Sequence, residues 1–256
     1  MSTPDGRIDA DTGVRWRAVA DAAQLHRTAC QRIVDAAARA IEERGKFLIV
    51  LAGGDTPRGV YKLLRTSTAD WSRWHVYWGD ERCVPANDAE RNSKMAADIW
   101  LDHVAIPRDQ VHTILAELGA SAAARAYADT LRNVGDFDLV LLGLGADGHT
   151  ASLFPKHDWG DVPDAPDALA VFDSPTPSSQ RVSLSATRLS RTREVLFLVA
   201  GESKREAVTR WLSGEPLPAA AVRLVAGVDV LVESALLAIE PVTQAAPSRA
   251  RRRYRP

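Results

Sequence analysis

Apolar segments of strand length alternate with amphipathic helical segments along most of this 256-residue chain. Asp21 and Gln24 have the spacing of a capping box, apolar residues then recur at helical intervals until Gly45, and the apolar run 47–52 follows at once. A run that is apolar at every position suits a parallel strand buried on both faces. Further strands are expected at 75–78, 137–145, 195–200 and 228–232, and further helices after 53–57 and at 92–101, 121–135 and 203–213.

This alternation predicts one α/β domain built on a doubly wound, mostly parallel sheet flanked by helices, a Rossmann-like arrangement. The domain is expected to span residues 16–243, between a flexible N-terminus (1–15) and a disordered, arginine-rich tail (244–256). Residues 156–180 contain four prolines and several acidic residues, which predicts a long connection with at most one edge strand.

The composition excludes several classes of protein. With 46% hydrophobic and 25% charged residues, the chain is neither disordered nor collagen-like, and two cysteines make no disulfide scaffold. The N-terminus lacks the features of a signal peptide, so a cytoplasmic protein is expected. The apolar runs fall well short of the roughly 20 residues that cross a membrane.

The net charge of −1 hides an uneven distribution. Residues 249–256 hold five arginines and no acid, so 27 basic and 33 acidic residues give 1–248 a net charge of −6. A mildly acidic domain makes nucleic acid an improbable partner. Any anion must therefore be captured by a local arrangement of residues.

The segment 52–57 follows the first buried strand and opens a helix. Gly53 and Gly54 let the backbone approach a ligand closely, Thr56 is placed as the N-cap and Pro57 as the first helical residue. The free N–H groups of such a helix start form an anion site. The spacing matches neither a Walker A loop nor a dinucleotide fingerprint, and a simple tight turn is the alternative interpretation.

Two carboxylates and a guanidinium follow the strand at 75–78. Holding Asp80, Glu81 and Arg82 together costs free energy unless these side chains pair or act on a ligand. The paired N–H donors of the Arg82 guanidinium suit phosphate. A local ion pair on a loop is the alternative. Cys83 is interpreted as a packing residue.

The strongest motif is 143–155, which follows the most apolar strand. It carries Asp147 and His149 two residues apart, on a loop where open α/β sheets place their ligands. Histidine titrates nearest neutrality, which makes His149 the candidate general acid–base. The other five histidines are interpreted as structural or solvated.

Two isolated cations are weaker candidates. Lys204 lies in the first turn of a helix, where a cation is unfavourable unless an anion binds, and a solvated lysine is the alternative. Arg181 is expected at a strand start, where a surface arginine is the alternative, and Asn92 is interpreted as a helix cap. Cysteine and histidine spacing fits no metal motif, so no metal is expected.

These motifs, in this order, resemble the 6-phosphogluconolactonase family, within the wider group that includes glucosamine-6-phosphate deaminases and isomerases. The segment 147–155 (DGHTASLFP) carries most of the resemblance. The resemblance implies hydrolysis of 6-phospho-D-glucono-1,5-lactone in the oxidative pentose phosphate pathway, with a functional link to glucose-6-phosphate dehydrogenase and without a cofactor. A monomer or weak dimer is expected. The implied site residues are His149 as the base, Asp147 as its support, and Gly53, Gly54, Thr56, Asp80, Arg82, Arg181 and Lys204 as binders of substrate or phosphate.

Two other functions share this fold. The deaminase branch typically carries a glutamate shortly after the histidine, whereas residues 150–154 hold no acid here. A non-catalytic phosphosugar sensor is the second alternative, but no helix-turn-helix pattern precedes Asp21. One departure from the family pattern is Asp55, an acid beside the expected phosphate loop, whose side chain is expected to point away or to pair with a base.

Overall fold

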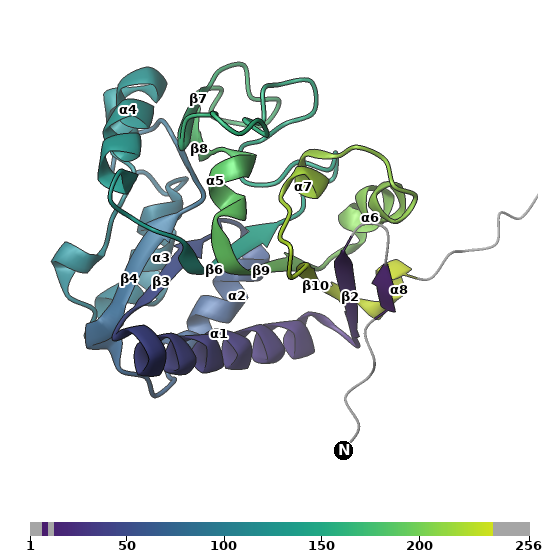
Figure 1. Cartoon of the computed structure of the whole chain (residues 1–256), viewed down its shortest axis with the longest axis horizontal. Helices are drawn as coiled ribbons and strands as arrows, with labels where there is room; N and C mark the ends of the chain where they lie inside the picture. The colour runs from purple at the N-terminus through teal and green to yellow at the C-terminus, as the bar shows by residue number, and fades with distance from the viewer. Residues whose placement is uncertain (1–6, 10–12, 238–256) are drawn as a thin grey trace, which may run out of the picture.

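The computed structural model describes residues 7–9 and 13–237, and its centre is a twisted sheet (Figure 1). Within these residues the main sheet has seven strands in the order β1-β2-β10-β9-β6-β3-β4. Only β1 runs antiparallel to its neighbour, which confirms the doubly wound, mostly parallel α/β fold. Its strands are β1 (Arg7–Asp9), β2 (Val14–Val19), β3 (Phe47–Leu51), β4 (Trp74–Trp78), β6 (Phe137–Gly143), β9 (Thr192–Val199) and β10 (Val228–Glu233).

A second, smaller sheet was not expected from the sequence. Its three antiparallel strands are β5 (Asp80–Arg82), β8 (Arg181–Leu184) and β7 (Ala168–Val171), in that order. β7 lies inside the long connection 156–180, where one edge strand was expected. β5 is too short for a periodicity to predict it, because the segment reads simply as three charged residues.

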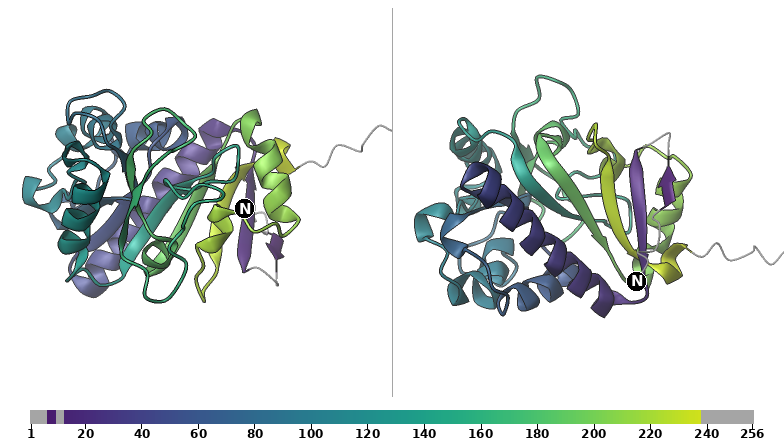
Figure 2. Two further views of the ribbon diagram at one scale, coloured as in Figure 1. Left: turned by 90° about the horizontal axis from the view of Figure 1, so that it is seen from above. Right: turned by 60° about the horizontal axis from the view of Figure 1, so that its bottom comes forward.

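Helices cover the main sheet, and α1 is the longest of those described (Figure 2). The Asp21 carboxylate accepts the N–H of Gln24, the Gln24 side chain accepts the N–H of Ala20, and Gly45 ends the helix with φ 74°. Both predicted ends of this helix are therefore confirmed. The described helices are α1 (Ala22–Arg44), α2 (Asp55–Leu64), α3 (Asn92–Ile99), α4 (Ala120–Leu131), α5 (Ala186–Ser190), α6 (Arg205–Leu212), α7 (Pro218–Ala221) and α8 (Ser234–Leu237), with short 3₁₀ turns at Trp71–Arg73, Leu101–His103, Arg108–Gln110, Ala116–Leu118 and Glu202–Lys204.

The N-terminal boundary differs from the sequence expectation. The range 1–15 was expected to be flexible, yet Arg7–Asp9 forms β1, and β2 begins at Val14 and pairs with β10 along its whole length. β2 alternates apolar residues with arginines, so this half-buried strand contains no continuous apolar run that would predict it. The expected tail, 244–256, lies outside the described residues.

The loops that carry the motifs meet at one edge of the main sheet. β3, β4, β6 and β9 are parallel, so the segments that follow them all leave from the carboxyl edge. Each of these strands is buried along most of its length, and the polar residues begin where the strands end. The fold thus concentrates its chemistry at this edge.

Candidate active site

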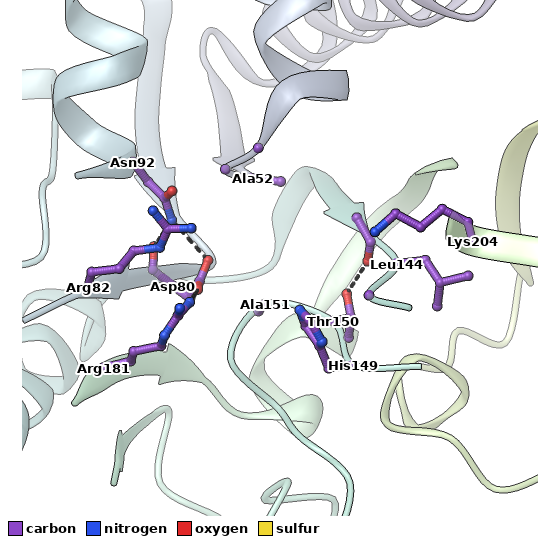
Figure 3. Close-up of a pocket in the computed structure, with 14 residues that line it drawn as sticks. Ala52, Asp80, Arg82, Asn92, Leu144, His149, Thr150, Ala151, Arg181 and Lys204 are labelled. Atoms are coloured by element: carbon purple, nitrogen blue, oxygen red, sulfur yellow. Dashed lines mark hydrogen bonds and ion pairs between the residues drawn. The ribbon is translucent and has the colours of Figure 1, made fainter. Parts of the chain in front are cut away.

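Residues from these loops enclose a cavity of about 190 Å³ at the carboxyl edge of the sheet. Figure 3 shows Arg82, Arg181, Asp80 and Asn92 on one side of it and His149 and Lys204 on the other. Of the predicted site residues, Gly53, Gly54, Asp80, Arg82, His149, Arg181 and Lys204 line the cavity together. Asp147 stands behind His149, and Thr56 does not line the cavity.

His149 and Asp147 form a hydrogen-bonded pair. The Nδ1 atom of His149 lies 2.5 Å from Oδ1 of Asp147, and the same oxygen accepts the backbone N–H of His149 at 3.1 Å. Burial alone would raise the pKa of Asp147, but these hydrogen bonds and the charge interaction with His149 hold it below its usual value. An ionised carboxylate on Nδ1 keeps the proton there, which leaves Nε2 as the basic nitrogen of the neutral ring.

The place of the imidazole is set by its neighbours. A Cβ on Gly145 would lie 2.0 Å from Nδ1 of His149, so the ring occupies space that only a glycine leaves open. The ring of Phe154 contacts the imidazole at 4.7 Å between centroids. The loop itself is closed by the Gly145 N–H bonded to the carbonyl of His149, and Gly148 supplies the positive φ of 91° that the turn requires.

The two arginines of the cavity differ in how many donors they have left. Arg181 donates to Thr176 Oγ1, Pro177 O and Ser178 O and lies 3.8 Å from Oδ2 of Asp80, so it ties the connection 173–180 to the site. Within the described structure the Arg82 guanidinium donates only to the carbonyl of Glu90, and its buried Nε has no partner. Arg82 is therefore the guanidinium with donors free for an anion.

Asp80 is held on both of its oxygens by neutral donors. Ser152 Oγ donates to Oδ2 at 2.6 Å, and the Asn92 amide donates to Oδ1 at 3.2 Å and to the Asp80 carbonyl at 3.0 Å. Asn92 also lies against the glycine loop, since a Cβ on Gly53 would meet its Oδ1 at 1.9 Å. Asn92 thus joins two loops of the cavity, which the capping interpretation of this residue missed.

The glycine loop opens α2, although the predicted cap is wrong. α2 begins at Asp55, and its N-cap is Gly54, which makes no side-chain cap bond and has φ 98°. Glycine reaches this backbone conformation without a steric penalty, so the helix starts before Thr56 can cap it. The side chain of Asp55 is fully exposed and 4.0 Å from Arg58, as expected of an acid that points away from an anion.

Lys204 approaches the cavity from the segment between β9 and α6 (Figure 3). Its ammonium forms no hydrogen bond or ion pair with any described residue. Burial lowers the pKa of Lys204, and the negative charge of Asp147 opposes that effect. A half-buried, unpaired cation that lines the same cavity as Arg82 favours an anionic ligand.

Several residues of the cavity were not predicted as site residues: Ala52, Asn92, Gly143, Leu144, Gly145, Thr150 and Ala151. The glycines and Thr150 lie in the strongest motif, so proximity to His149 was an available signal. Thr150 Oγ1 donates to the Gly143 carbonyl at 2.8 Å and fastens the loop to the end of β6.

The donor set does not suggest a metal centre. Among residues 7–9 and 13–237, no group of three or more histidine, cysteine or acidic side chains could hold a metal ion. The same described part contains no helix long and apolar enough to cross a membrane.

Comparison with known proteins shows the family of this chain. Residues 20–231 match the model of the family described as glucosamine-6-phosphate isomerases/6-phosphogluconolactonase. The chain belongs to this family. The 6-phosphogluconolactonase of Mycobacterium tuberculosis is 40% identical over 198 residues, and the match covers 72% of this chain and 80% of that protein. The Streptomyces coelicolor 6-phosphogluconolactonase is 40% identical over 201 residues, covering 72% and 75% of the two chains.

Solved structures of the family share the fold. The 6-phosphogluconolactonase from Thermotoga maritima superposes with a TM-score of 0.79 at 30% identity and covers 86% of this chain and 99% of its own. The Trypanosoma brucei enzyme gives 0.76 at 26% identity, with 86% and 96% covered. A monomeric glucosamine-6-phosphate deaminase gives 0.74 at 21% identity, a likeness of fold alone.

Proposed function

We propose that this chain hydrolyses 6-phospho-D-glucono-1,5-lactone to 6-phosphogluconate, with His149 as the general base. The observation that carries the proposal is the His149–Asp147 pair at the wall of a cavity lined by Arg82 and Lys204. Family membership and the lactonases among its relatives support the choice of reaction. In the oxidative branch of the pentose phosphate pathway, glucose-6-phosphate dehydrogenase would supply the lactone.

The proposed chemistry needs one base that later acts as an acid. Nε2 of His149 takes a proton from water while the water oxygen attacks the lactone carbonyl, and the imidazolium is stabilised by the Asp147 carboxylate. The tetrahedral oxyanion is stabilised by a cation or N–H group of the cavity. When the C–O bond of the ring breaks, His149 returns the proton to the departing ring oxygen. Atoms balance with water as the only co-reactant.

The phosphate end of the substrate is proposed to orient the ring. Lys204, Arg82 and the free N–H groups of Gly54 and the first turn of α2 supply the positive potential. Binding energy from this remote group fixes the carbonyl against His149, so it contributes to turnover as well as to affinity. The binding of substrate by Thr56, Asp80 and Arg181 stays a prediction. Asp80 is proposed to bind hydroxyl groups of the sugar, because a carboxylate repels phosphate.

The test generates the lactone in place with glucose-6-phosphate dehydrogenase and follows its disappearance with and without this protein. We expect faster loss than by spontaneous hydrolysis. A parallel assay with glucosamine 6-phosphate should release no ammonia, because residues 150–154 hold no acid. Ammonia release in place of lactone hydrolysis would overturn the proposal in favour of the deaminase branch.

Replacing the base is the sharper measurement. His149→Ala should lower kcat by about 10²–10⁴-fold, the usual contribution of a positioned general base. His157→Ala is the matched control, because His157 lies in the long connection and does not line the cavity. Near-wild-type turnover by folded His149→Ala would refute the assignment of the base.

A further inference from the structure

Glu81 is a fully buried carboxylate between two residues of the cavity, and the proposed mechanism does not use it. Its neighbours Asp80 and Arg82 both line the cavity. Because side chains alternate along β5, Glu81 points to the opposite face from these two. Burying an unpaired carboxylate costs free energy, so the groups that pair with Glu81 indicate its role.

The partners of Glu81 are the N–H groups of two adjacent segments. Oε1 accepts the backbone N–H of Arg82 at 2.9 Å and of Asn92 at 2.8 Å. Oε2 accepts the N–H and the hydroxyl of Ser93, both at 2.8 Å, and lies 3.3 Å from Nε of Arg91. Burial raises the pKa of Glu81, and these donors together with the charge of Arg91 oppose the rise.

The carboxylate acts as the cap of α3 from a distant segment. Arg91 is the N-cap residue by position, yet it makes no side-chain cap bond, and Asn92 and Ser93 are the first residues of the helix. Glu81 satisfies the N–H groups of both, and its negative charge suits a helix N-terminus. The start of α3 is thereby fixed to β5.

Two cavity residues depend on this junction. The Asn92 backbone is bonded to Glu81, while its amide holds Asp80 and packs against Gly53. The backbone N–H of Arg82, the residue whose guanidinium has free donors, is bonded to the same Glu81 oxygen. A shift of the Glu81 carboxylate would therefore move Arg82 and would also disturb the contact between Asn92 and Gly53.

We propose that Glu81 is a positioning residue, whose buried carboxylate sets the places of Arg82 and Asn92 for an anionic substrate. The choice of that substrate rests on the proposed function. The junction requires a side chain with two acceptor oxygens. In Glu81→Gln the amide nitrogen replaces one of these oxygens, and at either position this donor faces two N–H donors. An isosteric substitution therefore breaks the junction without removing volume.

The experiment measures affinity for inorganic phosphate and for 6-phosphogluconate by calorimetry, beside kcat and KM for the lactone. Glu81→Gln should weaken binding of both anions about tenfold, with unchanged stoichiometry, and raise KM more than it lowers kcat. Added to Arg82→Gln, it should cost less than it does in the wild-type background, because part of its effect acts through the Arg82 guanidinium. Losses that multiply independently would overturn the proposal, as would wild-type affinity in folded Glu81→Gln.

Two further variants complete the design. Glu117→Gln is the matched control, since Glu117 pairs with the same Arg91 at 3.2 Å but is exposed and lies outside the cavity, and it should bind phosphate as the wild type does. If Glu81→Gln does not fold, Ser93→Ala decides, because it removes one of the five contacts: weaker phosphate binding supports the proposal, and unchanged binding overturns it. If the wild-type protein binds phosphate but has no lactonase activity, the proposed function is wrong. The role of Glu81 is then decided by the phosphate affinities of the variants alone.

Discussion

At the scale of single residues, the site depends on side chains that are absent as much as on those present. Gly145 leaves the space that the His149 ring fills, and Gly53 leaves the space for the Asn92 amide. From the sequence, Gly53 was expected to let the backbone approach a ligand, and Gly145 had no role of its own. The side chains that fill the space beside these glycines, Asn92 and His149, become visible only in the fold. His149 and Asp147, by contrast, were both expected at the site, and the structure joins them by a hydrogen bond within one loop.

The contact between Gly145 and the imidazole gives a prediction. Gly145→Ala should displace the His149 ring and lower kcat/KM about 10²-fold, since a small misplacement of a reacting group has effects of that size. Gly135→Ala is the control, because a Cβ there meets no atom within 4 Å. Lactonase kinetics and melting temperatures of both variants check it. Equal activities in the two would mean that the ring tolerates the methyl group.

At the scale of elements, α1 is fixed across the sheet by ion pairs at the edge opposite the site. Three adjacent strands each carry, close to their first residue, an acid that pairs with an arginine of α1. Asp138 of β6 pairs with Arg44, Glu194 of β9 with Arg32 and Arg39, and Asp229 of β10 with Arg32. The apolar periodicity and the caps of α1 predicted the helix, but not these pairs, because the sequence alone does not show which strands lie side by side.

Asp229 should make stability depend on pH. Burial by itself raises the pKa of Asp229, but hydrogen bonds and charge from Arg15 and Arg32 outweigh it and bring the pKa to about 2. A carboxylate with a lowered pKa in the folded state stabilises the fold above its unfolded pKa, and the contribution is lost as the pH falls through the folded pKa. Asp229→Asn should therefore lower the free energy of unfolding by about 2 kcal/mol at pH 7.

The difference between wild type and Asp229→Asn should shrink as the pH falls from about 4 to about 2, as urea unfolding over that range can measure. Asp98→Asn is the control, because its pair with Lys94 is exposed and such pairs contribute little. A difference that stays constant down to pH 2 would contradict a charge effect.

At the scale of the whole molecule, the doubly wound sheet explains why motifs that are far apart in the sequence lie at one cavity. Parallel strands deliver the segments after β3, β4, β6 and β9 to one edge, so residues 150 positions apart line one cavity. The alternation of apolar runs and helices was enough to predict this convergence. The small antiparallel sheet could not be predicted in this way, because the paired residues of β5 and β8 are 99 to 103 positions apart and these short strands carry Asp80, Arg82 and Arg181 without a periodic signal.

The charge of the whole chain leads to the last prediction. Residues 1–248 carry a net charge of −6, so an anionic substrate would have to be attracted by the local potential of the cavity, to which Lys204, Arg82, Arg181 and the start of α2 contribute. At physiological ionic strength that potential extends about 8 Å, which makes the cavity independent of charges elsewhere on the chain. Deleting 249–256, with its five arginines, should therefore leave kcat/KM for the lactone within about twofold of wild type. Replacing those arginines by glutamine removes the charge and keeps the length of the tail. A large loss of kcat/KM in either variant at 0.15 M salt, about physiological, would show that the tail contributes to substrate capture.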